Sequence, residues 1–198
     1  MTKAEAHMFH ISSGRLEALR SLLHDHVPSE IRLSDNDLIA SLASMAIANG
    51  FYRKPSSGNG LVGRVKSACA SIIRGLFGNT TTEHLTFLIV DTRHRLGISM
   101  SGYTGNCVIP QLVINQSQRM GTPITPEAHA HVACRVRAAV QDFDRPYISQ
   151  FIRTLNEHPS SFAQPLVYSI NHPERVFVTN QSRFPLYSLN FGFGTPTW

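Results

Sequence analysis

The chain is poor in charged residues and in long apolar runs. Charged side chains make up 16% of its 198 residues, whereas about a quarter is usual in globular domains. This deficit is typical either of a compact enzyme or of a chain that hides part of its surface against a partner. No apolar run approaches the length of a membrane span, and residues 1–10 lack the apolar core of a secretory signal. We therefore expect a cytoplasmic protein with no membrane contact.

Cysteine is also scarce, and its spacing excludes the usual cysteine sites. Cys69, Cys107 and Cys134 are odd in number and far apart, so neither a zinc site nor a redox pair is predicted. They are typical of small buried residues in a reducing compartment. The net charge of +5 comes from scattered Lys and Arg. It favours phosphorylated ligands over nucleic acid, since there is no dense basic run.

Three other catalytic or ligand patterns are absent or weak. There is no nucleophile elbow of the G-x-S-x-G kind. Residues 58–63 match G-x-G-x-x-G, but a polar loop precedes them where a dinucleotide fingerprint needs a strand. We interpret them as a loop that enters a helix, although Asp91, at the end of the next buried strand, leaves the dinucleotide alternative open. The pairs His24/His26 and His129/His131 are two residues apart, which on a helix points side chains to different faces. They are predicted to be surface histidines.

Hydrophobic periodicity predicts a single α/β domain over residues 1–198. The clearest helix starts at Ser34, where Asp37 three residues later forms a capping-box pattern, and stops near Gly50. The run over residues 84–90 is continuously apolar, which favours a strand buried on both faces. In chain order, strands are predicted at 8–11, 84–90, 107–109, 176–179 and 185–189. Helices are predicted from about 12–14 until residues 24–28 end the first one, and then at 35–50, 62–76, 126–143 and 147–157.

The most informative segment is near the C-terminus, where an apolar strand runs into Asn190-Phe191-Gly192-Phe193-Gly194. Two glycines that flank a ring suit a backbone that bends sharply or is closely approached. Four segments, in this order, resemble the BAHD-type and trichothecene-type acyltransferases. They are Ser34-Asp35-Asn36-Asp37-Leu38-Ile39-Ala40, Val90-Asp91-Thr92-Arg93-His94-Arg95-Leu96, Tyr103-Thr104-Gly105-Asn106, and the Asn190 segment, which is similar to Asp-Phe-Gly-Trp-Gly.

The resemblance implies a fold and a reaction. The fold would be the C-terminal lobe of a two-lobe, chloramphenicol-acetyltransferase-like enzyme, a mixed sheet with flanking helices. An acyl group would pass from acyl-CoA to a hydroxyl or amine of a small molecule, in secondary-metabolite biosynthesis. Acyl-CoA would be a co-substrate, with no permanently bound cofactor and no metal. Tyr103, Gly105 and Asn106 are the candidate residues for binding it.

The resemblance also implies a structural motif that joins two distant segments. In the family, the Asp of the last motif pairs with the first Arg of the Val-Asp-x-Arg strand end. Asn190 stands in place of that Asp, and Arg93 is kept beside Asp91. An Asn carbonyl can still accept a hydrogen bond from a guanidinium. Phe193, in place of Trp, keeps an aromatic filler between Gly192 and Gly194, next to Phe191.

The family's base, the His of a His-x-x-x-Asp motif in the N-terminal lobe, has no counterpart in the sequence. Only His26 has an acid four residues on, Glu30, and Pro28 between them indicates an exposed loop. We therefore predict no catalytic residue in this chain and an absent catalytic lobe, so that activity would need a partner chain with that lobe, or a homodimer. Two alternatives stay open: an inactive fragment or binding subunit, and other chemistry with His94 or Asp91 as acid or base.

Overall fold

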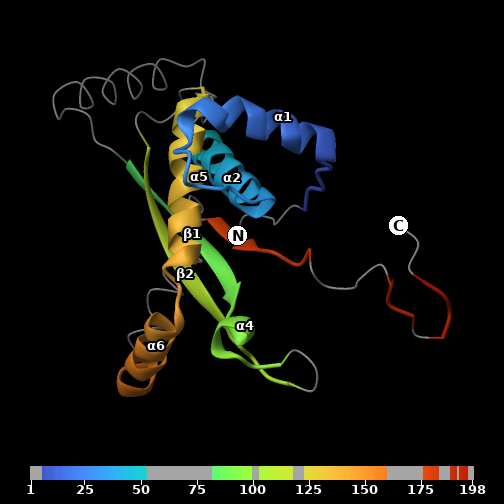
Figure 1. The fold of residues 1–198 in the computed structure, drawn as a ribbon, viewed down its shortest axis with the longest axis vertical. Coiled ribbons are helices and arrows are strands. Elements are labelled where there is room, and N and C mark those ends of the chain that lie inside the picture. The colour runs from blue at the N-terminus through green and yellow to red at the C-terminus, as the bar shows by residue number, and fades with distance from the viewer. Residues whose placement is uncertain are drawn as a thin grey trace, which may run out of the picture.

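The computed structural model describes residues 6–52, 82–99, 103–117, 123–159, 176–182, 188–190 and 192–195. Helices lie against one face of a small sheet (Figure 1). The elements in chain order are α1 (Ser13–Leu23), the 3-10 helix η1 (His24–His26), α2 (Asp35–Tyr52), β1 (Thr82–Asp91), α4 (Arg93–Leu96), β2 (Val108–Ser117), α5 (Pro126–Gln141), α6 (Arg145–Glu157) and β3 (Val176–Thr179).

The helices begin at polar caps that the sequence supplies. Ser34 and Asp37 form the predicted capping box: the Ser34 N–H donates to Asp37 Oδ2 at 2.8 Å and the Asp37 N–H donates to Ser34 Oγ at 3.3 Å. The Thr125 hydroxyl accepts from the Ala128 N–H at the start of α5. Asp144 does the same for Tyr147 at the start of α6. These local signals explain why the predicted starts of α2 and α5 are confirmed.

The sheet is mixed, with strand order β2-β1-β3. β1 pairs antiparallel with β2, from Thr82↔Ser117 to Asp91↔Val108. It pairs parallel with β3, from Thr86↔Val176 to Ile89↔Thr179. The predicted α/β class, with a mixed sheet and flanking helices, is therefore confirmed for the part of the chain that the structure describes.

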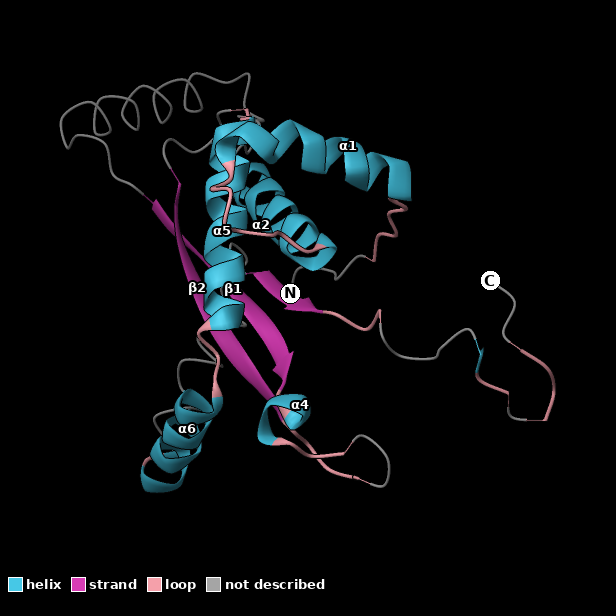
Figure 2. Cartoon of the chain, viewed as in Figure 1, coloured by secondary structure: helices cyan, strands magenta, loops and turns pink. Residues whose placement is uncertain are grey.

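One face of the sheet is buried beneath the helices, which Figure 2 shows on the same side of the strands. Leu88 and Val113 point from the strands into a core that contains Ala40 of α2 and Val136 of α5. A second cluster packs α1 and the segment after it against α2 and α5; it consists of Leu23, Leu33, Leu38, Ala130 and Ala133. A third cluster packs α6 against the start of β2; it consists of Ile109, Phe143 and Ile148.

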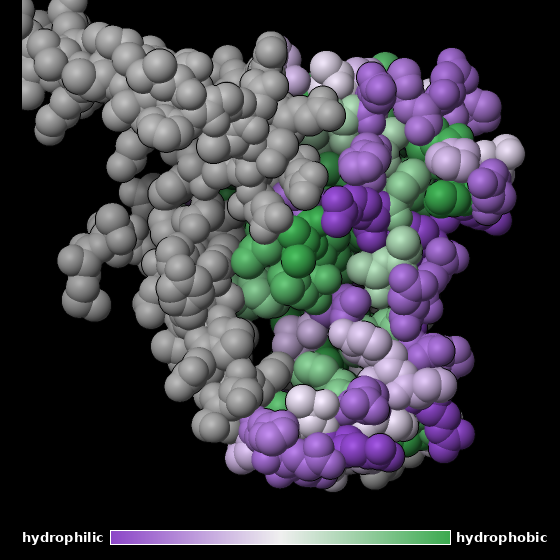
Figure 3. All heavy atoms as spheres, turned by 90° about the vertical axis from the view of Figure 1, so that its left-hand side faces the viewer, coloured by the Kyte–Doolittle hydropathy of each residue, from purple (hydrophilic) through white to green (hydrophobic). Residues whose placement is uncertain are grey.

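The opposite face of the sheet is apolar and only half covered. Side chains alternate between faces along a strand, and the register brings one apolar set together around Phe87 and Phe177, whose rings stack with centroids 4.8 Å apart. Leu112 and Ile114 on this face are 40% and 41% exposed, and Phe87 is half-buried. This outer sheet face consists of Leu85, Phe87, Ile89, Val108, Pro110, Leu112, Ile114 and Phe177. Figure 3 views the molecule from the side on which β2 forms the edge of the sheet. It also shows a hydrophobic patch with polar side chains along part of its border.

Several predictions differ from the structure or lie outside it. Residues 8–11 form no strand, and Met8 and Phe9 are 97% and 84% exposed. The strand predicted at 107–109 runs on to Ser117, and α6 starts at Arg145, earlier than predicted. Burial of β1 on both faces is wrong, since Leu85, Phe87 and Ile89 are half-buried. The helix predicted at 62–76 and the glycine pattern at 58–63 lie outside the described residues, as does most of the strand predicted at 185–189.

Candidate functional site

The end of β1 and the start of β2 bring two of the motif segments together. The register sets Asp91 opposite Val108, so that the segment after Asp91 lies beside the segment before Val108. Thr92 ties them: its N–H and its hydroxyl each donate to the Cys107 carbonyl at 2.9 Å. Thr92 is 1% exposed. This strand-end site, residues 91–95 and 103–107, contains the candidate acyl-CoA-binding residues and one half of the structural motif that the resemblance implies.

Asp91 and Arg93 form a two-pronged ion pair at the centre of the strand-end site. Arg93 Nε donates to Asp91 Oδ1 at 2.9 Å and its Nη2 donates to Oδ2 at 2.6 Å. The Arg93 backbone N–H also donates to Oδ1, at 3.0 Å. These hydrogen bonds from Arg93 lower the pKa of Asp91, although partial burial opposes them. A carboxyl that stays ionised in this way is a poor proton donor near neutral pH, which argues against Asp91 as a catalytic acid.

Tyr103, Gly105 and Asn106 also lie together, in the segment that leads into β2. The Tyr103 ring lies against Gly105: a Cβ added at Gly105 would lie 3.0 Å from the tyrosine hydroxyl. Asn106 Oδ1 accepts from the Val108 N–H at 3.2 Å, which fixes the entry into the strand. All three residues are exposed. Their predicted role in binding acyl-CoA thus falls on a surface that a ligand can reach.

The C-terminal motif forms a turn closed by its own first residue. Asn190 Oδ1 accepts from the N–H groups of Gly192 at 2.8 Å and Gly194 at 3.2 Å. The two glycines have φ of +95° and +98°, a region that other residues rarely adopt. This explains the Gly-x-Gly pattern. Phe193 at the tip is 98% exposed. Phe191 lies outside the described residues.

The structure does not bring this turn to the strand-end site. Figure 1 shows the red segment before the C-terminus well away from α4, which carries Arg93. Arg93 has Asp91 as its partner, and Asn190 has the two glycines. The contact between Asn190 and Arg93 that the resemblance implies is therefore not formed here.

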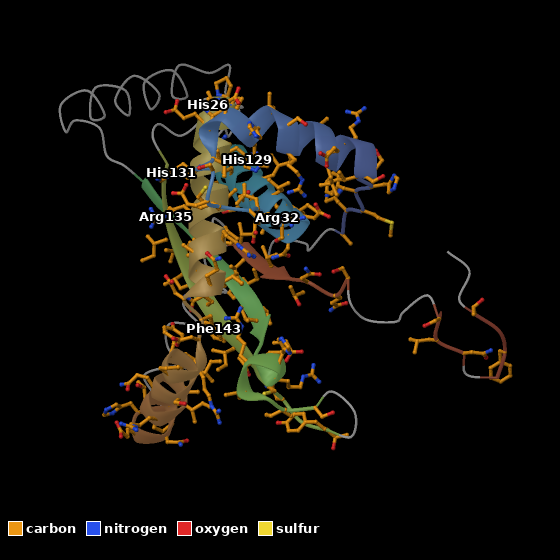
Figure 4. All side chains as sticks on the ribbon, viewed as in Figure 1. His26, Arg32, His129, His131, Arg135 and Phe143 are labelled. Atoms are coloured by element: carbon orange, nitrogen blue, oxygen red, sulfur yellow. The ribbon has the colours of Figure 1, made fainter. Side chains whose placement is uncertain are left out.

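The histidines fall into two environments, only one of which the sequence predicted. His24, His26, His94 and His131 are exposed, and the contact of His24 with Asp25 lies fully in solvent. His129 is 2% exposed, so the prediction that it lies on the surface is wrong. Figure 4 places it between α5 and α2. The sequence pattern that could have indicated its burial is helical spacing, since Ala133 and Val136, four and seven residues later, lie on the same buried face of α5.

His129 belongs to a buried polar row between the helices and the sheet. On α2, Asp37, Ser41 and Ser44 share the face that α5 and the sheet cover. Ser44 Oγ lies 2.5 Å from Thr86 Oγ1 on β1. The whole row consists of Asp37, Ser41, Ser44, Thr86, Asn115 and His129, each at most 2% exposed. Such a row specifies how the layers align, because buried polar groups must find partners; it lies too deep to meet a substrate.

Other site types find no support among the residues described. No three His, Cys, Asp or Glu side chains there gather as a metal site would require. Cys107 and Cys134 are free thiols, while Cys69 is outside the described residues. No helix in the described ranges combines the length and apolar character that a membrane crossing needs. His26 and Glu30 are both exposed, as predicted, although His26 ends the 3-10 helix η1 and does not lie in a loop.

Comparison with known families finds a match for most of the chain. A family model described as the Transferase family matches residues 53–198. The matched range contains three of the four motif segments, those at 90–96, 103–106 and 190–194, while the segment at 34–40 precedes it. A comparison with curated proteins finds no match.

Proposed function

The chain belongs to the Transferase family, the family of the BAHD acyltransferases, and on this basis we propose that it serves in acyl transfer from acyl-CoA to a hydroxyl or amine. The acceptor would be a small molecule of secondary metabolism, and the reaction would take place in the cytoplasm. The observation that carries the proposal is the family match over the strand-end site and the C-terminal turn.

We assign the described residues to one lobe of a chloramphenicol-acetyltransferase-like enzyme. A lobe of this kind needs a second layer over the sheet, and the outer sheet face is apolar enough to accept one: Leu112, Ile114 and Phe177 are 40–41% exposed. Contiguous apolar surface of this kind is typical of interaction sites. The second layer would be a catalytic lobe on a partner chain or a second copy of this chain.

The proposal needs a general base from that second layer. His129 is buried, and its ring bonds to the Ser41 hydroxyl and the Leu38 carbonyl, so that a substrate in solvent cannot contact it. The exposed histidines of the strand-end site and η1 face solvent without a buried partner to orient them. General acid–base catalysis requires a positioned group within hydrogen-bond reach of the transferred proton. A histidine on the added lobe would take the proton from the acceptor as it attacks the thioester.

The test is a reconstitution assay. Release of CoA from acetyl-CoA is followed with a panel of hydroxylated acceptors, first with this chain alone and then with a separately expressed catalytic lobe of a BAHD enzyme. A lobe in which the His of the His-x-x-x-Asp motif is changed to Ala is the matched control. We expect turnover only with the unmodified lobe. Turnover by the chain alone would contradict the assignment of the base to another lobe.

A binding role without catalysis is the second candidate. It is favoured by the lack of an oriented histidine base among the residues described, and by the exposed, preformed loop at Tyr103, Gly105 and Asn106. Saturable acetyl-CoA binding to the chain, measured by calorimetry, with no turnover in any combination of lobes, would support this candidate over the enzyme. Absence of both binding and turnover would contradict both functions.

A further inference from the structure

The contact between α2 and α5 contains one buried titratable ring. His129 of α5 is 2% exposed. Its Nε2 lies 2.9 Å from the Ser41 hydroxyl and 3.2 Å from the Leu38 carbonyl oxygen, both on α2. These are hydrogen bonds between segments about 90 residues apart in the chain. His129 therefore joins the two helices that cover the sheet.

The partners indicate which ring nitrogen of the neutral imidazole carries the hydrogen. A carbonyl oxygen only accepts, so Nε2 must carry the hydrogen that points to Leu38. The Ser41 hydroxyl donates to the Asp37 carbonyl at 2.7 Å, which leaves its oxygen free to accept from the same Nε2–H. Both contacts are thus satisfied by the neutral imidazole. A second proton would have to bind at Nδ1 and would place a full charge inside the helix layer.

We propose that His129 makes the contact between α2 and α5 sensitive to pH, so that protonation of the ring loosens α2 from α5 in mildly acidic solution. The proton comes from solvent and binds at Nδ1, with no other bond made or broken. The cost is that of a charge in a nearly dry site, which proteins avoid unless a counter-charge lies close. The inference is independent of the acyl-transfer proposal.

The charged groups on the elements packed around His129 are committed elsewhere or face solvent. On α2, the Asp37 carboxylate accepts from the Ser34 N–H at 2.8 Å and lies 3.8 Å from Arg137 Nη1 of α5. Arg20 of α1 donates to the Leu33 carbonyl and to Asp35. The other titratable groups on these elements are exposed or half-buried: Arg15 and Glu17 on α1, Glu127, His131, Cys134 and Arg135 on α5, and His24, Asp25 and His26 on η1.

The direction of the effect follows from this burial. Burial lowers the pKa of His129, and the hydrogen bond to the Leu38 carbonyl opposes that shift only in part. A lowered folded-state pKa means that the unfolded chain binds the proton first. The stability that the neutral ring supplies is complete above the ordinary histidine pKa of about 6.5 and is lost as pH falls through the lower, folded-state value.

Loosening at this point would affect the core next to it. Leu38, whose carbonyl accepts from His129, belongs to the cluster that also contains Leu23, Ala130 and Ala133. Helices α2 and α5 also pack against the buried face of the sheet, through Ala40 and Val136. The histidine therefore sits where a single proton acts on two of the three core clusters.

Urea unfolding of the full chain at pH 7.5, 6.5, 5.5 and 5.0 tests the proposal, with His129→Gln compared with His131→Gln. Glutamine keeps an N–H donor and does not titrate, and His131 is the exposed neighbour on the same helix. We expect the urea midpoint of the wild type and of H131Q to fall in parallel toward pH 5.0, and that of H129Q to fall by less than half as much. An equal fall in all three proteins overturns the proposal.

A second measurement covers the case in which H129Q does not fold. In the wild-type protein, the imidazole Cε1–H resonances are followed by NMR from pH 8 to pH 5. We expect His129 to keep its neutral shift to a pH below the ordinary histidine pKa of about 6.5, with the amide signals of α2 and α5 broadening as it titrates. If His129 titrates at that ordinary value, the inference is wrong.

Discussion

Replacement of Phe143 by Ala tests the packing that positions the strand-end site. Phe143 is fully buried and packs with Ile109 of β2 and Ile148 of α6. Its ring also lies 5.0 Å from that of Tyr147, between centroids, and 5.7 Å from the guanidinium carbon of Arg95. Buried Phe→Ala changes cost about 3–5 kcal/mol, and loss of a cation–π contact to a half-buried Arg adds about 0.5–1 kcal/mol. We expect a total loss of about 3.5–6 kcal/mol.

The matched control is the same substitution at Phe193, which is 98% exposed. Substitutions at such positions stay within about 0.5 kcal/mol. Both variants are measured by urea unfolding, followed by far-UV circular dichroism at 25 °C. Because domains are stable by about 5–15 kcal/mol in total, the two midpoints should separate clearly. Equal costs at the two positions would refute the reasoning, since the C-terminal turn would then be packed in solution as tightly as the core.

Two further predictions concern the strand-end site. Asp91→Asn removes the carboxylate that binds Arg93. Because the pKa of Asp91 is lowered in the fold, the carboxylate stabilises the folded state above about pH 4, and this stabilisation is lost as pH falls. The variant should therefore lose less stability than the wild type between about pH 4 and pH 2 in acid unfolding, and an unchanged acid profile would count against the ion pair. Asn106→Ala should weaken acetyl-CoA binding about 5- to 10-fold in calorimetry, the worth of one hydrogen bond. Asn180→Ala is its control, since Asn180 makes the same kind of turn, accepting from the Ser182 N–H at 2.9 Å; equal affinities in the two variants would exclude Asn106 from the binding site.

Features that depend on neighbours in sequence could be predicted well. The capping box of Ser34 and Asp37 uses atoms three residues apart, so the pattern alone defines it. A sharp bend was predicted from the two glycines of the C-terminal turn, and their positive φ angles agree. The approach of segments 91–95 and 103–107 was not predicted from the sequence, and the pairing of β1 with β2 produces it.

Features that depend on distant partners could not be predicted. Residues 8–11 have the composition of a strand, yet a strand needs a neighbour to satisfy its backbone, and none of the described strands pairs with them. β2 continues through Gln111 and Asn115, polar residues that are not typical of a buried strand. Their partners are distant in sequence: Tyr147 of α6 donates to Gln111, and Asn115 donates to Thr86 of β1. His129 looks like a surface residue in isolation, because its acceptors lie on a helix about 90 residues earlier.

The parallel pairing of β1 with β3 has a consequence for how the chain is made. β3 begins about 60 residues after β2 ends, and ribosomes add about 5–20 residues per second. For roughly 3–12 seconds, the edge of β1 that later pairs with β3 is therefore open in the nascent hairpin of β1 and β2. Open edges of apolar strands invite pairing with other chains. Successful synthesis would then depend on whatever shields that hairpin until its third strand emerges.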